Sequence, residues 1–288
     1  MRRAAAYLLA LGLAVPFMGF SSGFSSGAAA EPQRVVAVGG AITEIVYALG
    51  AQNLLVGTDT TGYWPPPARA LPKVGYQRTL SAEGILSLRP NLLIVTEQAG
   101  PPAVLQQVQA ANVALLALKD GRSLDDVEEA VQVLAAALNR RAAGAELRRQ
   151  LAQERAALQR LRGQASAPPR VLFLMHHGGG PPLVAGRSTA ADSIIALSGG
   201  ENVVQEWRGY KPLTPEAAVA LAPDILLTTT QSLEQSGGEA GLLRLPGVGL
   251  TPAGKRQRVI AMDALLLLGF GPRTARAAMD LHRRYQKP

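Results

Sequence analysis

Apolar residues follow two alternating patterns along the chain. Short unbroken apolar runs are typical of strands buried on both faces. Between them, apolar positions recur every three or four residues, as in helices that pack on one face. This alternation predicts parallel sheets flanked by helices. The expected strands span residues 34–38, 92–95, 113–118, 171–175, 225–227 and 259–262. The expected helices span residues 42–49, 101–111, 123–138, 189–197 and 272–285, with two more after Ser81 and Thr214.

One helical pattern is longer than the others and divides the chain. It runs without proline from Arg141 to about Gln164, roughly 20 residues or about 30 Å long. A new alternation of strands and helices starts after Pro168–Pro169. The sequence therefore predicts an α/β fold with two lobes, each a mostly parallel sheet flanked by helices, joined by one long helix. The predicted parts are an N-terminal lobe (31–139), a connecting helix (140–166) and a C-terminal lobe (167–288).

Residues 1–30 have the segment order of a cleavable secretory signal peptide. Arg2 and Arg3 form a basic start, an apolar core follows, and Ala28–Ala30 offers a small-residue cleavage site. The chain contains no cysteine, so we expect neither disulfides nor a cysteine-linked lipid anchor. The mature protein is expected in the periplasm.

The chain is basic, with a formal net charge of +8 at pH 7. A basic balance suits an anionic ligand, a membrane surface or a nucleic acid. Because export separates the protein from nucleic acid, we expect no nucleic-acid partner, and the charge serves an anionic ligand, a membrane surface or nothing specific.

Two stretches, residues 74–95 and 209–227, share one plan. Each contains a Gly-Tyr pair, a residue suited to cap a helix N-terminus, and a glutamate in the first helical turn. These residues are Tyr76, Ser81 and Glu83 in the first stretch and Tyr210, Thr214 and Glu216 in the second. Chance recurrence is the alternative explanation. A duplicated plan predicts one ligand held between two lobes.

Two loops carry further candidate ligand-binding residues. The irregular segment 59–78 contains Tyr63, Trp64 and Tyr76, which could form an apolar wall. In the second half, His176 and His177 begin a glycine-rich loop directly after a predicted strand. Open α/β sheets bind ligands at the carboxyl ends of their strands, so we expect both loops to contribute to the site.

Several motifs together resemble one family across the predicted mature chain. They are residues 73–78, 80–84, 183–187, 189–192, 199–202 and 213–216. The resemblance is to the periplasmic haem-binding proteins of bacterial haem-uptake ABC transporters (PhuT, ShuT and HmuT type), within the helical-backbone class of substrate-binding proteins. It implies haem as the transported ligand.

By this resemblance, Tyr76 is the axial ligand of the iron in ferric haem. A phenolate oxygen is a hard anionic donor suited to Fe(III), and tyrosine is a known type of haem ligand. A nearby cation favours the phenolate form. Arg78, two residues further on, is the expected source of that charge.

The second lobe supplies the other expected haem contacts. His176 or His177 could reach the opposite face of the iron or bind a second haem, or could be cleft residues without iron. Tyr210, Lys211 and Arg208 could meet the haem propionates, which suit a cationic rim.

The resemblance also implies a membrane partner. Glu83 and Glu216 are expected to dock with arginines of an ABC transporter permease dimer in the inner membrane, with the protein acting as a monomer. The alternative is that both glutamates only stabilise their helix N-termini.

Two other functions are less consistent with the sequence. An enzyme is not expected, because the chain has no cysteine, its histidines are His176, His177 and His282, and Ser188 lacks the G-x-S-x-G context,. A bare-metal carrier is not expected either, since the first lobe contains no histidine. The same fold carrying a corrinoid or a ferric siderophore remains the alternative.

Overall fold

The computed structural model describes residues 33–163, 167–176 and 180–287. The predicted signal peptide and His177 lie outside the described residues. Within these ranges, no helix combines the length and the apolar character needed to cross a membrane.

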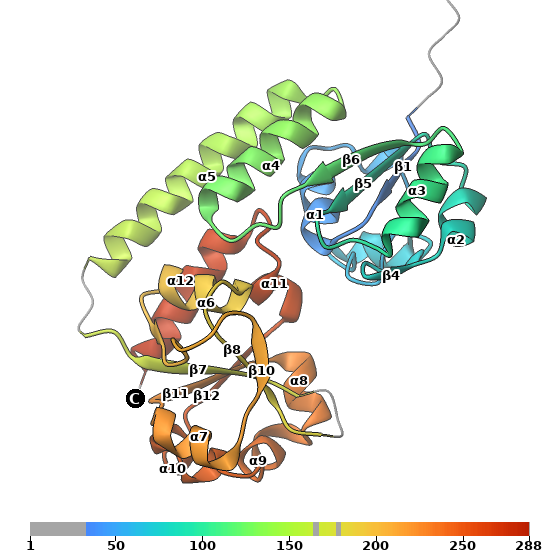
Figure 1. Ribbon diagram of the computed structural model, residues 1–288. Helices are drawn as coiled ribbons and strands as arrows, with labels where there is room; N and C mark the ends of the chain where they lie inside the picture. The colour runs from blue at the N-terminus through green and yellow to red at the C-terminus, as the bar shows by residue number, and fades with distance from the viewer. Residues whose placement is uncertain (1–32, 164–166, 177–179, 288) are drawn as a thin grey trace, which may run out of the picture. The chain divides into compact units, whose positions relative to one another are not determined.

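The first sheet lies in the N-terminal part of the chain, and all its strand pairs are parallel (Figure 1). Its strand order is β2-β1-β5-β6. Its strands are β1 (Val35–Ala37), β2 (Leu55–Thr58), β5 (Leu92–Thr96) and β6 (Ala114–Leu118). Strand β2 was not predicted, because Gly57 and Thr58 interrupt its apolar pattern. Gly57 allows close packing, since a Cβ atom there would lie 2.4 Å from Leu88 Cδ1.

The second sheet is mixed, with the order β10-β8-β7-β11-β12 and β9 paired to β7. Strands β7, β9, β11 and β12 pair in parallel, whereas β8 pairs antiparallel with both β7 and β10. Its strands are β7 (Arg170–Met175), β8 (Leu183–Ala185), β9 (Glu201–Asn202), β10 (Tyr210–Pro212), β11 (Ile225–Thr229) and β12 (Val259–Met262). Strand β10 was not among the strands expected from the sequence, and it places Tyr210 on an edge of the second sheet.

Helices flank both sheets, and α5 follows the pattern predicted for the connecting helix. It packs against α4 and α12. The helices near the first sheet are α1 (Gly40–Ala48), α2 (Ala82–Ser87), α3 (Pro102–Ala110) and α4 (Leu124–Ala137), followed by α5 (Arg141–Arg162). The later helices are α6 (Ala190–Leu197), α7 (Pro215–Leu221), α8 (Thr230–Gln235), α9 (Gly238–Leu243), α10 (Pro252–Lys255), α11 (Ala264–Leu268) and α12 (Thr274–Tyr285). The short 3-10 helices are η1 (Gln52–Leu54), η2 (Pro66–Ala70) and η3 (Val248–Leu250).

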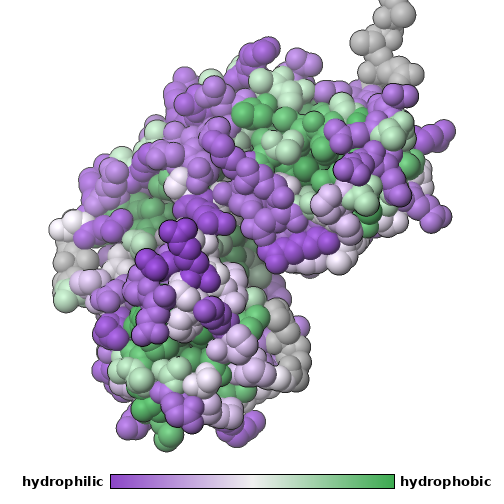
Figure 2. Space-filling view, in the orientation of Figure 1, coloured by the Kyte–Doolittle hydropathy of each residue, from purple (hydrophilic) through white to green (hydrophobic). Residues whose placement is uncertain are grey.

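The exposed face of α5 is polar, as its sequence suggests. Arg148 and Arg149 are exposed, whereas Leu147, Leu151 and Leu158 are buried against the neighbouring helices. Figure 2 shows many hydrophilic residues along α4 and α5 on the face in view. The predicted α/β fold class is confirmed, while the lobe boundaries stay a prediction.

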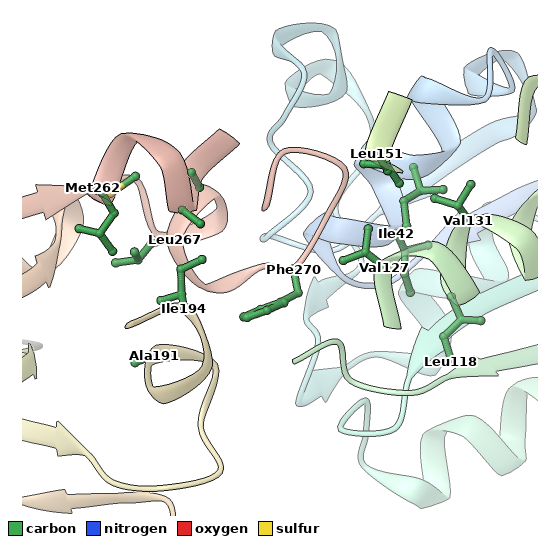
Figure 3. Close-up of a cluster of buried hydrophobic side chains, with 14 of the residues drawn as sticks. Ile42, Leu118, Val127, Val131, Leu151, Ala191, Ile194, Met262, Leu267 and Phe270 are labelled. Carbon is green, nitrogen blue, oxygen red and sulfur yellow. The ribbon is translucent and has the colours of Figure 1, made fainter. Parts of the chain in front are cut away.

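One buried hydrophobic cluster includes residues from both sheets and from α5. In Figure 3, Phe270 lies between Ile194 of α6 and Val127 of α4. A Cβ atom on Gly121 would lie 2.9 Å from the Cβ atom of Phe270, so the glycine allows the chain to approach Phe270 closely. The segment between β12 and α12 therefore contributes to the core beside the first sheet.

Candidate functional site

Tyr76 lies on a short hairpin made of β3 (Gly75–Tyr76) and β4 (Thr79–Leu80). Tyr76 pairs with Thr79, so Gln77 and Arg78 form the turn. Gly75 adopts a φ of +102°, and a Cβ atom there would lie 2.9 Å from the Thr79 carbonyl oxygen. A glycine at this position therefore lets the two strands approach. The Tyr76 side chain is 41% exposed and available to a ligand.

The hairpin is fixed to the loop that follows β5. The Gly100 backbone N–H donates to the Gln77 carbonyl at 2.9 Å, and the Leu80 N–H donates to the Gly100 carbonyl at 2.9 Å. The Arg78 guanidinium donates to the side-chain oxygen of Gln98. The turn is thus held by both backbone and side-chain bonds.

Tyr210 is the candidate residue of the second sheet that the structure brings near the hairpin. It lies on edge strand β10, 39% exposed, with its ring edge-on to Phe173 at a centroid distance of 6.4 Å. Burial raises the pKa of the Tyr210 phenol, while a hydrogen bond with Thr189 and the positive charges of Arg78 and Arg122 lower it. Burial outweighs these opposing effects, and the charge of Arg78 at the hairpin turn is among the charges that face this phenol.

Lys211 and Arg208 are exposed cations beside Tyr210. The Lys211 Nζ atom lies 5.3 Å from the centre of the Trp207 ring. The backbone of Arg208 pairs with that of Arg187. Among the described residues, neither Lys211 nor Arg208 has an acidic partner within ion-pair distance. Both side chains can meet an anionic group of a ligand.

His176 is partly buried and held by α8. Its backbone N–H donates to the Ser232 hydroxyl at 2.6 Å, and its Nδ1 atom lies 3.3 Å from the Ser236 hydroxyl oxygen. His282 has a structural role instead. Its ring is buried, and its Nδ1 atom lies 2.9 Å from the Ser198 carbonyl oxygen.

Glu83 and Glu216 are exposed in the first turns of α2 and α7. The predicted caps are confirmed: Gly84 N–H donates to the Ser81 hydroxyl at 3.1 Å, and Ala217 N–H donates to the Thr214 hydroxyl at 3.2 Å. Both glutamates are thus presented by equivalent capped helices.

Three polar residues near the hairpin and Tyr210 were not predicted from the sequence. Gln98 follows β5, while Asp120 and Arg122 follow β6. All three come after the carboxyl ends of adjacent parallel strands. The rule that places ligand sites at this edge of a sheet could have identified them.

The chain belongs to the periplasmic binding protein family, whose sequence model matches residues 35–266. The apo periplasmic haem-binding protein RhuT from Roseiflexus sp. RS-1 is 45% identical, with a TM-score of 0.85 over 88% of this chain and 97% of that chain. BhuT, solved in complex with two haems, is 44% identical, with a TM-score of 0.84 over the same shares. A periplasmic haem-binding protein from Pseudomonas aeruginosa is 36% identical, with a TM-score of 0.81 over 87% of this chain and 91% of that chain.

Curated relatives are more distant. An uncharacterised ABC transporter substrate-binding lipoprotein of Bacillus subtilis, YvrC, is 23% identical over 87% of this chain and 79% of its own length. A vitamin B12-binding protein of Pectobacterium atrosepticum is 26% identical over 62% of this chain and 64% of its own length. The predicted resemblance to haem-binding members of the family is confirmed by the solved structures.

Proposed function

We propose that this protein captures ferric haem in the periplasm and delivers it to an ABC transporter permease. The proposal rests on one arrangement: the exposed phenol of Tyr76 on a fixed hairpin, with Arg78 at the turn and Tyr210 near that arginine. Haem is the cargo here, and the protein carries it without changing it chemically.

In this function Tyr76 ligates the iron through its phenolate oxygen. Arg78 supplies the positive charge that favours this anion. On the second sheet, Tyr210 offers a ring face and a hydroxyl group, and Lys211 and Arg208 attract the haem propionates. The residues present therefore fit both the iron and the carboxylates of haem.

A histidine of the second half could contact haem as well. His176 is fixed through Ser232 and Ser236, so its ring has a defined position. We propose His176 or His177 as the contact on the opposite face of the iron or on a second haem. BhuT was solved in complex with two haems, which supports testing the stoichiometry.

A corrinoid is the second candidate ligand. Vitamin B12-binding proteins are among the curated relatives. The one from Pectobacterium atrosepticum is 26% identical over 62% of this chain. The greater identity to haem-binding structures favours haem. A ferric siderophore is an alternative cargo for the same fold.

For delivery, we propose that Glu83 and Glu216 dock on a permease dimer in the inner membrane. Both are exposed and occupy the same position on capped helices. A two-lobed carrier can in this way contact both subunits of the pore. We further propose that the protein acts as a monomer after removal of its signal peptide.

Titration of the mature protein with ferric haem and, separately, with cyanocobalamin tests the ligand. We expect saturable haem binding with a high-spin, tyrosinate-type visible spectrum. The Tyr76→Phe variant should lose that spectrum and weaken binding by more than the roughly 10- to 100-fold typical of outer-shell partners. Tyr47→Phe, on α1, is the matched control and should bind as wild type. Binding of cyanocobalamin but not haem would contradict the proposal.

A further inference from the structure

Arg78 needs support if its charge is to stay near a ligand. It lies in the two-residue turn of the hairpin, and its side chain is exposed. A long side chain at such a position loses conformational entropy when one orientation is required, so contacts that fix it beforehand strengthen binding.

The structure provides such contacts through one glutamine. The Arg78 guanidinium donates to Gln98 Oε1, and Gln98 Nε2 donates to Asp120 Oδ2. A glutamine amide has both an acceptor and a donor, so a single side chain links the cation to the carboxylate. Hydrogen bonds in such a chain polarise one another, which strengthens the hold on the guanidinium.

The supporting residues are themselves fixed by the first sheet. Gln98 follows β5 and Asp120 follows β6, which are adjacent parallel strands. The Glu97 N–H donates to the Leu118 carbonyl at 3.0 Å, and the Ala99 N–H donates to the Thr96 carbonyl at 3.0 Å. The link therefore connects the hairpin turn to the carboxyl edge of a rigid sheet.

We propose that Gln98 and Asp120 are positioning residues that hold the Arg78 guanidinium beside the ligand-binding phenol of Tyr76. They need not touch the haem. The inference rests on the proposed function, because the consequence of a misplaced Arg78 is a weaker bond between Tyr76 and the iron.

The first test uses the protein without haem. ¹⁵N NMR relaxation of the Arg78 Nε–H group should report a rigid side chain in the wild type and a mobile side chain in Gln98→Leu. Asp120→Leu should have the same effect, whereas Asp120→Asn keeps an acceptor oxygen and should retain most of the order. Gln106→Leu, an exposed glutamine on α3, is the matched control and should change nothing.

The second test measures the ferric haem complex. Gln98→Leu and Asp120→Leu should shift the tyrosinate-to-iron charge-transfer band and speed haem transfer to apomyoglobin by about 10-fold, the effect expected of outer-shell partners. Asp120→Asn and Gln106→Leu should stay close to wild type.

The outcomes separate this inference from the proposed function. If Arg78→Ala alters the spectrum while Gln98→Leu and Asp120→Leu leave spectrum, transfer rate and Arg78 order unchanged, the inference is overturned and the proposed function stands. If the wild type shows no tyrosinate spectrum with haem, the proposed function fails and this inference fails with it.

Discussion

The buried Glu44 and the partly exposed Arg273 form an ion pair, although they lie 229 positions apart in the sequence. Arg273 Nε donates to one Glu44 carboxylate oxygen at 3.2 Å, and Nη2 donates to the other. The guanidinium also lies 4.4 Å from the centre of the Trp64 ring. The Glu44 side chain is only 6% exposed. Through these contacts Arg273 ties the start of α12 to α1 and to Trp64 of the irregular segment 59–78.

Removing one partner of this pair should destabilise the fold strongly. Arg273→Met leaves the Glu44 carboxylate buried without its cation, so we expect the free energy of unfolding to fall by about 3 to 5 kcal/mol at pH 7. Urea unfolding measures this change. Arg149→Met is the matched control, because both side chains of its ion pair with Glu146 are exposed, at 72% and 51%. The control should cost less than about 1 kcal/mol. Equal losses of unfolding free energy in both variants would show that the burial of Glu44 does not increase the cost of removing its partner.

The loss caused by Arg273→Met should depend on pH. Burial raises the pKa of Glu44 above its usual value of 4.5, and the hydrogen bond and charge of Arg273 lower it in part. A raised pKa in the folded state means that proton binding stabilises the fold below pH 4.5, and that this contribution disappears as pH rises through the folded-state pKa. Without Arg273 the pKa should rise further.

Urea unfolding measured from pH 7 down to pH 4.5 tests the direction of this pH dependence. The deficit of Arg273→Met relative to wild type should shrink as the solution becomes acidic. In a Glu44→Gln background the deficit should be smaller at pH 7 and independent of pH. A deficit that grows on acidification would contradict the assignment.

Ionisation of the Tyr63 phenol should destabilise the folded protein at high pH. Its hydroxyl donates to Asp263 at 2.9 Å and accepts from the Leu265 N–H at 3.0 Å. Burial first, and then the neighbouring Asp263, raise the pKa of Tyr63 to about 12, although the bond from Leu265 opposes them. Stability from the protonated phenol is therefore fully present below pH 10 and lost as pH rises through 12.

The Tyr63→Phe variant separates this effect from other alkaline titrations. We expect it to lose about 1 to 3 kcal/mol near pH 8, because the partly buried Asp263 carboxylate and Leu265 N–H each lose a hydrogen-bond partner,. It should also lose stability less steeply than wild type above pH 10. Burial raises the pKa of Tyr285 too, so some alkaline loss should remain. Parallel curves for variant and wild type would exclude Tyr63 as a contributor.

Charge reversal should separate haem binding from delivery. The double variant Glu83→Lys/Glu216→Lys should bind ferric haem as wild type does, since both side chains are exposed and neither is a proposed haem contact. It should lose stimulation of ATP hydrolysis by the reconstituted permease–ATPase complex of the same organism. Glu239→Lys, an exposed first-turn acid on α9, is the matched control. Normal stimulation by the double variant would contradict docking through these glutamates.

The site was predictable only in part. The spacing around Tyr76, including Gly75 and Ser81, is local, and the hairpin and helix cap it indicates are present. The support of Arg78 by Gln98 and Asp120 was not predicted. Gln98 lies 20 positions after Arg78, and Asp120 lies 22 positions after Gln98, so no local pattern links them. Their proximity depends on β5 and β6 being neighbours in the sheet.

The sequence by itself determined the α/β class, the main strands and helices, and the caps Ser81 and Thr214. These features depend on apolar periodicity and on bonds between residues three positions apart. The tertiary structure decided which segments meet. Strand β10 exists because Tyr210–Pro212 pairs with Leu183–Ala185, and Glu44 is paired because the chain returns Arg273 to α1. Such contacts leave no local pattern, since their energy comes from burial and pairing that exist only after the chain has folded.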